Sequence, residues 1–328
     1  MNKKRISKVF KQISLPYALT TSPSDIKYFT GLDAEGVLLL NPSKSFLFLS
    51  PLYPYRAEYI KKLDEFYKLK IKKIAVEPSK ISLKLVSEIK KKIRCQIFPV
   101  DFLFSKVRAI KEKSEIEKIA KSQEISKDIL RKLKIKTQDS EADVSRKLIK
   151  KALSLADGLS FEPIVAFGKN SFFPHHKSSN AKFKKKFALI DFGVKKDGYC
   201  SDLTQMFGLS NMNRRLKEAY RVLRKAVEIL CLNIKEGAVI SGAVQVASNF
   251  LEKMGFSKNI LHSFGHGIGL DIHEWPSISL KEKGKFQNGM VFTIEPGLYF
   301  EGFGGVRIED VFVLWKGKVI PVSEWRKV

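Results

Sequence analysis

Long apolar runs and paired cysteines are both missing from this 328-residue sequence. No stretch approaches the ~20 consecutive apolar residues that a membrane-crossing helix needs. The basic start MNKKR leads into the polar KVFKQIS rather than into the apolar region of a signal peptide. The three cysteines are scattered, which indicates a reducing compartment rather than a disulfide framework. We therefore expect a cytoplasmic protein with no membrane partner.

Acidic residues are scarce as well, because 34 Asp and Glu stand against 60 Lys and Arg, for a net charge of +26. Basic proteins often bind nucleic acid through their summed field. Here the lysines are spread over many segments and interleaved with acids or with helical apolar positions, without a single stripe or a known binding motif. A solvated lysine-rich surface is the favoured interpretation, and nucleic acid is not an expected partner.

The first of two differently patterned segments covers residues 1–110. Its short apolar runs, such as GVLLL and SFLFLS, alternate with Pro and Asn turn signals and read as strands. An amphipathic stretch predicts a helix from about Ser79 to Ile93. We expect a small α/β domain here, since a chain of this length is typical of about two domains.

The second segment, residues 111–328, begins with helices and continues with strands. Ser114 with Glu117, and Ser140 with Asp143, have the spacing of capping boxes and predict two helix starts, the second helix ending at Gly158. Strands around FEPIVAF and FALIDFG follow, then two more helices, then strands from about residue 260. The segment is predicted to be α+β.

Two stretches of the second segment share one pattern of apolar strand, acid, turn, apolar strand, acid: ALIDFGVKKDGYCSDLTQMF and FTIEPGLYFEGFGGVRIEDVFVL. In the first, Asp197-Gly198 is a strong hairpin turn signal. That turn places Asp191 and Asp202 opposite or diagonal to each other on one face of the sheet. The repetition indicates a pseudo-symmetric domain.

In the second stretch, a turn around EGFGG places Glu295 and Glu309 opposite each other on one face. Any one of these acids alone could be paired with a lysine or point to solvent. Like charges facing across a ladder are destabilising, and a buried carboxylate is costly unless paired. Four acids on two such faces therefore predict a cation between them.

All five histidines lie in the Gly-, Pro- and acid-rich strand segments and none in the lysine-rich helices. His262 and His266 are an even number of residues apart, so an extended chain places them on one face. Four carboxylates and an imidazole suit Mn, Co or Fe(II), with Zn as an alternative. Two such cations could share a bridging water and lower its pKa to give a hydroxide nucleophile, which is the chemistry of hydrolysis.

These residues resemble the pita-bread metallopeptidase family, which contains Xaa-Pro aminopeptidase, prolidase, methionine aminopeptidase and the metal-free creatinase. The motifs IDFG…GYCSDLT, HSFGHGIGLDIHEWP, FTIEPGLYF and GGVRIED carry the resemblance in the family's order, and NSFFPHH and DIKYFTGLDAEGVLLL extend it upstream. The resemblance implies a creatinase-like N-terminal domain over residues 1–110 and a pseudo-symmetric pita-bread catalytic domain over 111–328. That N-terminal domain argues against a methionine aminopeptidase.

Carried over by position, the resemblance implies two divalent metal ions, Mn being favoured, and a role for each site residue. Asp191 would bind the first metal, Asp202 and Glu309 would bridge both, and His266 and Glu295 would complete the second. Glu295 would also help deprotonate the bridging water, and His273 would stabilise the tetrahedral intermediate or hold the scissile carbonyl. The proline-side pocket would be lined by His175 and His262, with Arg307 nearby.

The implied activity is hydrolysis of the bond between an N-terminal residue and proline, by a homodimer acting on a peptide or a dipeptide. Gln205 and Met206 stand where many relatives have Arg and Thr, which leaves the choice between prolidase and Xaa-Pro aminopeptidase open. Glu274 and Trp275 are interpreted equally well as supporting the site or as strand packing. The alternative function, motivated by the charge, is a catalytically idle pita-bread module that binds protein or nucleic acid.

Overall fold

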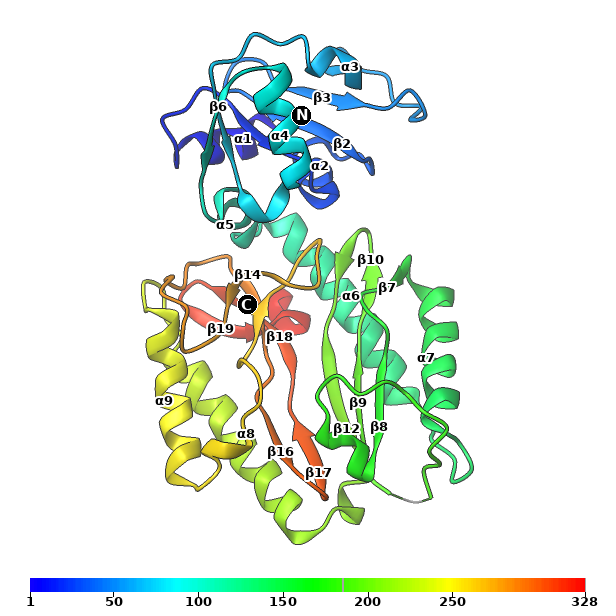
Figure 1. The fold of residues 1–328 in the computed structure, drawn as a ribbon. Coiled ribbons are helices and arrows are strands. Elements are labelled where there is room, and N and C mark those ends of the chain that lie inside the picture. Colours follow the sequence, from blue (N-terminus) through cyan, green and yellow to red (C-terminus); the bar gives the residue numbers. More distant parts are fainter. Residues whose placement is uncertain (185, 328) are drawn as a thin grey trace. The chain divides into compact units, whose positions relative to one another are not determined.

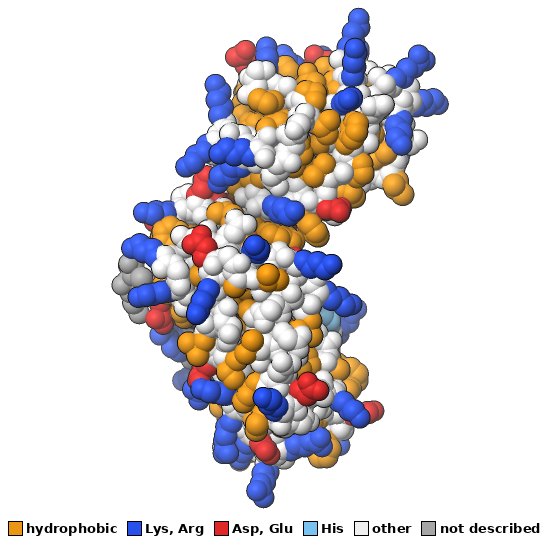
Figure 2. Space-filling view, turned by 90° about the vertical axis from the view of Figure 1, so that its left-hand side faces the viewer, with side chains coloured by type: hydrophobic (Ala, Val, Ile, Leu, Met, Phe, Trp, Pro, Cys, Tyr) orange, Lys and Arg blue, Asp and Glu red, His pale blue; other side chains and the backbone are white. Residues whose placement is uncertain are grey.

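The computed structural model describes residues 1–184 and 186–327 and divides the chain into two compact units, Met1–Arg108 and Ala109–Val328 (Figure 1). Among the described residues, no helix is both long and apolar enough to cross a membrane. On the face shown in Figure 2, Lys and Arg side chains are dispersed and interleaved with apolar and acidic ones, without forming a continuous stripe.

Unit 1 contains a six-stranded mixed sheet in the order β4-β3-β2-β1-β5-β6. The strands are β1 (Ala18–Thr20), β2 (Gly36–Leu40), β3 (Phe46–Leu49), β4 (Ile60–Lys62), β5 (Lys73–Val76) and β6 (Gln96–Pro99). The helices are α1 (Lys3–Phe10), α2 (Pro23–Thr30), α3 (Leu63–Phe66), α4 (Leu83–Lys92) and α5 (Leu103–Ala109), with a 3₁₀ turn η1 (Pro78–Lys80). The helix α4 begins later than predicted, because the Ser82 hydroxyl accepts a hydrogen bond from Leu85 N and caps it there.

The long helices in the described part of unit 2 are α6 (Lys113–Lys132), α7 (Glu141–Leu155), α8 (Arg214–Asn233) and α9 (Ile240–Lys253). Ser140 and Asp143 form the predicted capping box of α7. The prediction for α6 was wrong, because Glu112 and Glu115 form its capping box two residues before Ser114 and Glu117. The predicted end of α7 at Gly158 was also wrong, since the backbone is already extended at Ala156.

The strands of unit 2 form two similar halves, as the pseudo-symmetric pattern predicted. The first half contains β7 (Gly158–Leu159), β8 (Ile164–Phe167), β9 (Ala188–Phe192), β10 (Val194–Lys196), β11 (Tyr199–Cys200) and β12 (Leu203–Phe207). The second half contains β13 (His266–Gly267), β14 (Glu274–Ser277), β15 (Val291–Ile294), β16 (Gly297–Phe300), β17 (Gly304–Arg307), β18 (Asp310–Trp315) and β19 (Lys318–Pro321). The 3₁₀ turns are η2 (Gly168–Phe172), η3 (Leu209–Asn211), η4 (Ser257–Asn259) and η5 (Val322–Lys327).

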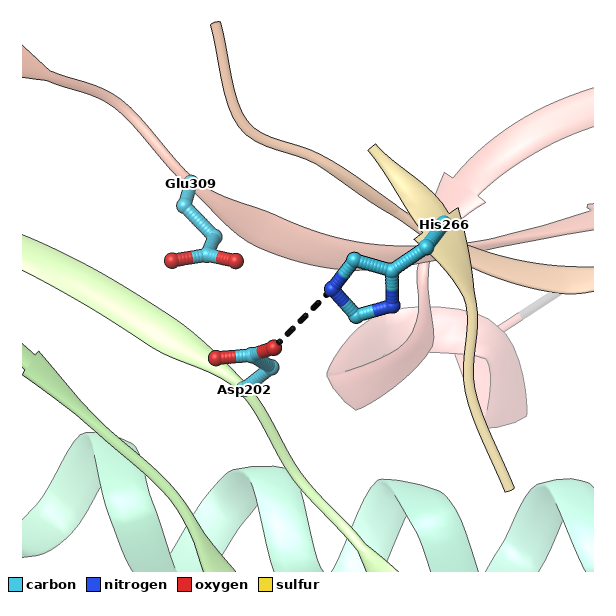
Figure 3. A group of neighbouring side chains, drawn as sticks. All are labelled: Asp202, His266 and Glu309. Atoms are coloured by element: carbon cyan, nitrogen blue, oxygen red, sulfur yellow. Dashed lines mark ion pairs between the residues drawn. The ribbon is translucent and has the colours of Figure 1, made fainter. Parts of the chain in front are cut away.

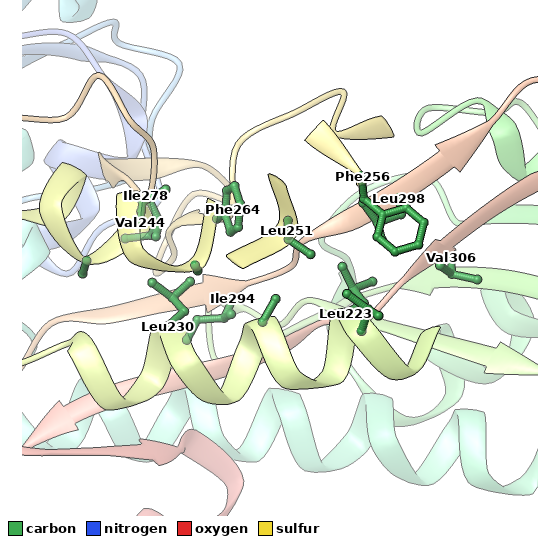
Figure 4. Close-up of a cluster of buried hydrophobic side chains, with 14 of the residues drawn as sticks. Leu223, Leu230, Val244, Leu251, Phe256, Phe264, Ile278, Ile294, Leu298 and Val306 are labelled. Atoms are coloured by element: carbon green, nitrogen blue, oxygen red, sulfur yellow. The ribbon is translucent and has the colours of Figure 1, made fainter. Parts of the chain in front are cut away.

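Each half packs its sheet against its own pair of helices (Figure 1). Apolar side chains of α6 and α7 pack on β8, β9 and β12. Leu223 and Leu230 of α8, with Val244 of α9, pack on Ile294 and Leu298 in the second half (Figure 4). Burial of these apolar faces stabilises the fold by about 25 cal/mol per Å². Because the helices cover one face of each sheet, the opposite face can present polar side chains.

Candidate metal centre

The first pair of carboxylates lies on strand β9 and just before its neighbour β12. Asp191 of β9 pairs in register with Thr204 of β12, so Asp202, the residue before β12, lies diagonal to Asp191. Both side chains are buried, at 9% and 4% exposure. Asp197 and Gly198, both at positive φ, form the predicted two-residue turn between β10 and β11. The predicted placement of the two acids on one face is therefore confirmed.

The second pair lies where two ladders meet. Ile294 pairs with Asp310 at the end of β15–β18, and Gly297 pairs with Arg307 at the start of β16–β17. Glu295 and Glu309 therefore face each other between these two ladders, as the sequence predicted. Glu309 is buried and Glu295 is partly exposed.

His266 enters the same space from β13. Gly265, at a φ of +152°, lies so close to the backbone of Thr293 that a Cβ there would collide with its carbonyl oxygen. The imidazole Nδ1 lies 3.0 Å from Gly267 O and donates a hydrogen bond to it. The other ring nitrogen, Nε2, faces the acids, 3.5 Å from Asp202 Oδ2 and 3.2 Å from Glu295 Oε1.

Three of these side chains converge closely enough to hold one ion. Potential ligand atoms of Asp202, His266 and Glu309 all lie within 4.8 Å of one another, and the three side chains point toward a common space (Figure 3). They line a cavity of about 440 Å³, together with Asp191 and Glu295.

Asp191 is held by a guanidinium on one side only. Arg307 Nη2 donates to Asp191 Oδ2 at 2.6 Å, and both groups are buried. The other oxygen, Oδ1, has no hydrogen-bond partner among the described residues. A buried carboxylate oxygen without a hydrogen-bond partner is uncommon, and this oxygen is suited to bind a cation.

The carboxylates are electrostatically crowded. Burial, together with the charges of Asp191 and Glu295, raises the pKa of Asp202 well above its ordinary value. Burial and the charges of Asp202 and Asp191 do the same to the pKa of Glu309. Burial also raises the pKa of Asp191 and Glu295, although Arg307 opposes it. A cation at their centre would reverse each of these shifts.

The donor set fits divalent cations. Carboxylate oxygens with one imidazole nitrogen suit a hard to borderline metal such as Mn, Fe(II), Co or Zn. Asp191 Oδ1, which has no hydrogen-bond partner among the described residues, is a position where such a cation fits.

The remaining predicted residues surround this centre. His175, His262, His273 and Arg307 all line the same cavity. His262 Nε2 lies 2.8 Å from the Tyr299 hydroxyl, which also accepts from Arg307 Nη1 at 3.1 Å. Burial and the nearby Arg307 lower the pKa of His262 to about 4, so this ring is neutral at pH 7. The ring centroid of His273 lies 4.4 Å from that of His266.

Several supporting residues were not predicted from the sequence. Thr204 donates to Glu309 Oε2 at 2.6 Å and accepts from Arg307 Nε at 2.9 Å, so it joins the two acid pairs. Tyr299 joins Arg307 to His262. Thr204 and Tyr299 each lie an even number of residues from a ligand, Asp202 and Glu295, but this is a weak signal, because Thr and Tyr are common in any strand.

The structure also resolves two open questions from the sequence. Glu274 forms a buried 2.9 Å ion pair with Lys111 and accepts from Asp271 N, so it supports the loop that carries His273. Trp275 packs against the core of the second half. Met206 belongs to that core too, and among the described residues the cavity lining includes neither Met206 nor Gln205.

Comparison with known proteins adds a family match to this geometry. The sequence model of metallopeptidase family M24 matches residues 117–315, which include all five candidate ligands. A Xaa-Pro dipeptidase of Pyrococcus horikoshii is 31% identical over 332 residues, covering 95% of this chain and 94% of the relative.

Solved structures agree over nearly the whole chain. A prolidase from Pyrococcus horikoshii OT3 superposes with a TM-score of 0.89 at 28% identity, covering 98% of each chain. An X-Pro aminopeptidase from Thermotoga maritima MSB8 superposes with a TM-score of 0.85 at 27% identity, covering 96% of this chain and 97% of the other. The α+β fold predicted from the sequence is therefore the fold of these peptidases.

Proposed function

This chain belongs to metallopeptidase family M24, and from that premise and the geometry of its cavity we propose that it is a dinuclear-metal exopeptidase that cleaves the bond between an N-terminal residue and proline. The family membership supports a divalent metal. The number of ions and the substrate are our proposal. The observation that carries it is the set of four carboxylates around a single cavity, with one imidazole whose Nε2 faces them.

Each ligand has a proposed place. Asp191 would hold the first ion through the oxygen that Arg307 does not occupy. Asp202 and Glu309, from opposite halves of the unit, would contact both ions. His266, through Nε2, and Glu295 would complete the second. We propose Mn for both positions, with Co, Fe or Zn as the alternatives that the same donor set allows.

When bound, the two cations supply an activated water as the nucleophile at neutral pH. The protein's own residues do the rest. Glu295 is the partly exposed member of the carboxylate group, and it lines the cavity, where it could accept a proton from a bound water. It is the proposed general base.

The other side of the cavity holds the substrate. His262 is neutral, and its ring is fixed by Ser263 O on one side and by the Tyr299 hydroxyl on the other, so it forms a rigid part of the cavity wall. We assign His273 to the scissile carbonyl or the tetrahedral intermediate. His175 and Arg307, together with His262, are assigned to the proline side.

The substrate class follows the relatives, which are named as a Xaa-Pro dipeptidase, a prolidase and an X-Pro aminopeptidase. For this chain a dipeptide or a short peptide with proline in the second position is the proposed substrate. The predicted homodimer, cytoplasmic location and creatinase-like character of the first unit stay predictions.

The proposal is tested with metal-stripped protein. Mn or Co is added back, hydrolysis of Ala-Pro is compared with that of Ala-Pro-Ala, and bound metal is counted. We expect no turnover without metal, recovery with it, and two ions per chain. A metal-loaded protein that cleaves neither peptide would refute the proposed activity.

The matched variants are Asp202→Asn and Asp33→Asn. The first removes a shared ligand and should lower kcat/KM at least about a hundredfold. The second changes an exposed carboxylate in unit 1, paired only at the surface with Lys27, and should leave turnover intact.

A further inference from the structure

Glu141, the first residue of α7, is a fully buried carboxylate outside the metal centre. It accepts hydrogen bonds from Phe167 N at 2.7 Å and Asn170 Nδ2 at 2.8 Å through one oxygen. Through the other it accepts from Ser179 N at 2.9 Å and Ser179 Oγ at 2.6 Å, and it contacts His176 Nε2 at 2.8 Å. Five donors on one carboxylate exceed what stabilising a helix start requires.

These donors lie near the two ends of the segment 167–179, whose middle reaches the cavity. Phe167 and Asn170 lie near its start and Ser179 at its end, so the Glu141 side chain holds both ends of the segment. Pro174 and His175, in its middle, line the cavity.

His175 itself is held only through its neighbours. Its ring is exposed, and among the described residues no hydrogen bond to it is recorded. The preceding Pro174 O accepts from Arg307 Nη1 at 3.3 Å, and the following His176 ring contacts Glu141. The position of the His175 ring therefore depends on two flanking anchors, one on each side.

The second anchor, the hydrogen bond between His176 and Glu141, is charge-assisted. Burial alone would raise the pKa of Glu141, but its donors from Ser179, His176 and Phe167 outweigh burial and lower that pKa below its ordinary value. The carboxylate is therefore ionised and accepts from His176 Nε2–H. Hydrogen bonds to an ionised group are the stronger kind and fix geometry well.

We propose that Glu141, acting through His176, is a positioning residue that orients His175 toward the substrate. This inference rests on the proposed function for its kinetic consequence, but not for the orientation of the ring. Because His175 is assigned to binding rather than to the chemical step, losing the anchor raises KM much more than it lowers kcat.

The test uses two substitutions of His176 and two of acids on α7. His176→Leu removes the donor, and His176→Gln restores an N–H that can reach Glu141. Glu141→Gln leaves the shape but removes the charge. Asp143→Asn is the matched control, because Asp143 caps the same helix through Ser140 without contacting the segment 167–179 in any recorded hydrogen bond.

We expect KM for Ala-Pro to rise about tenfold or more in Glu141→Gln and His176→Leu, with kcat within about threefold and bound metal unchanged. His176→Gln should recover most of the loss, and Asp143→Asn should lower Tm without raising KM. A folded His176→Leu protein whose KM stays within twofold of the parent overturns the inference, even if Glu141→Gln fails to fold.

A second measurement does not depend on activity. The chain has only five histidines, so the His175 ring signal can be followed by NMR in labelled protein. We expect it to shift or broaden in His176→Leu and to return in His176→Gln. If the parent cleaves no Xaa-Pro peptide yet the ring signal behaves in this way, the proposed function fails while the positioning role stands. An unaltered signal in His176→Leu overturns the positioning role.

Discussion

Thr204 connects the two carboxylate pairs through a single hydroxyl, and its replacement by valine tests that connection. The variant Thr204→Val nearly keeps the side-chain shape but leaves Glu309 Oε2 and Arg307 Nε without this partner. Residues that orient metal ligands contribute about ten- to a hundredfold to metal affinity. We expect a loss of that size, measured by competition with a chromogenic chelator.

Thr30→Val is the control for this substitution. Thr30 also donates from its hydroxyl, to Ile26 O within α2 of the first unit, and has no connection to the ligands. Metal affinity should stay at the parental value in this variant. Equal affinities for Thr204→Val and Thr30→Val would show that the hydroxyl of Thr204 does not organise the site.

A second residue-scale prediction concerns pH in the absence of metal. The pKa values of Asp202 and Glu309 are raised in the folded state by burial and by neighbouring carboxylates. The folded protein therefore binds these protons more tightly than the unfolded chain, so the stability that these two groups contribute is fully present below the ordinary carboxyl pKa and is lost as pH rises through the raised values. In metal-free protein, the Tm of the parent should therefore fall relative to that of Asp202→Asn between pH 5 and pH 8.

The variant Asp202→Asn tests whether the crowded carboxylates destabilise the metal-free protein. At pH 8 without metal the variant should be more stable than the parent by about 1–2 kcal/mol, or roughly 2–8 °C in Tm, because one crowded charge is gone. With Mn present the order should reverse. A metal-free variant that melts below the parent at pH 8 would mean that the carboxylates do not repel one another appreciably.

At the residue scale, the candidate metal ligands could be predicted from the sequence, whereas the residues that hydrogen-bond to them or to their neighbours could not. Asp191 and Glu309 stand out because an acid inside an apolar strand is rare. Thr204, Tyr299 and Glu141 do not, because their roles depend on partners that folding brings from distant parts of the chain.

At the element scale, the hairpin β16–β17 depends on glycines beneath one aromatic ring. A Cβ on Gly305 would collide with the Tyr299 ring and with Ser171 O, which is backbone and cannot swing away. Gly305→Ala should therefore destabilise the protein by about 2–4 kcal/mol, measured as a lower urea midpoint at an unchanged m-value.

Gly242→Ala is the matched control for this element. Gly242 lies in α9, and a Cβ there would meet nothing within 4 Å. Alanine is the better helix former, so this variant should gain about 0.5–1 kcal/mol. A Gly305→Ala protein as stable as Gly242→Ala would contradict the packing described for Tyr299.

The hairpins and the start of α7 could be predicted from the sequence, whereas the start of α6 and one strand could not. The Asp197-Gly198 turn signal lies between two apolar stretches and therefore predicts the hairpin that joins them. Glutamate is an uncommon N-cap, which is why Glu112 was missed as the start of α6. The stretch from His262 to Gly265 is not a strand, because Gly265 at φ +152° interrupts the extended chain.

At the scale of the whole molecule, the two units should respond differently to metal. All five candidate ligands belong to unit 2. Since a ligand stabilises only the folded form that binds it, metal at about 100 times its Kd should raise the melting temperature of unit 2 by about 5–10 °C and leave unit 1 unchanged. Calorimetry with and without chelator measures both transitions.

Asp202→Asn provides the control here as well, because chelator should then have little further effect on unit 2. Two transitions that shift together would contradict independent responses of the units. The pseudo-symmetric architecture of unit 2 was foreseeable from its repeated hairpin pattern, while the division of the chain at Arg108 was visible in the sequence only as a change of composition.

Asp202 and Glu309 lie roughly 100 residues apart along the chain and come from opposite halves of unit 2. A cation held between them connects those halves much as a removable cross-link would. The halves cannot separate without releasing it, so irreversible heat inactivation should begin with metal loss. The half-life of the protein at a fixed high temperature would then lengthen with free metal concentration, which makes cation supply a determinant of how long each molecule survives.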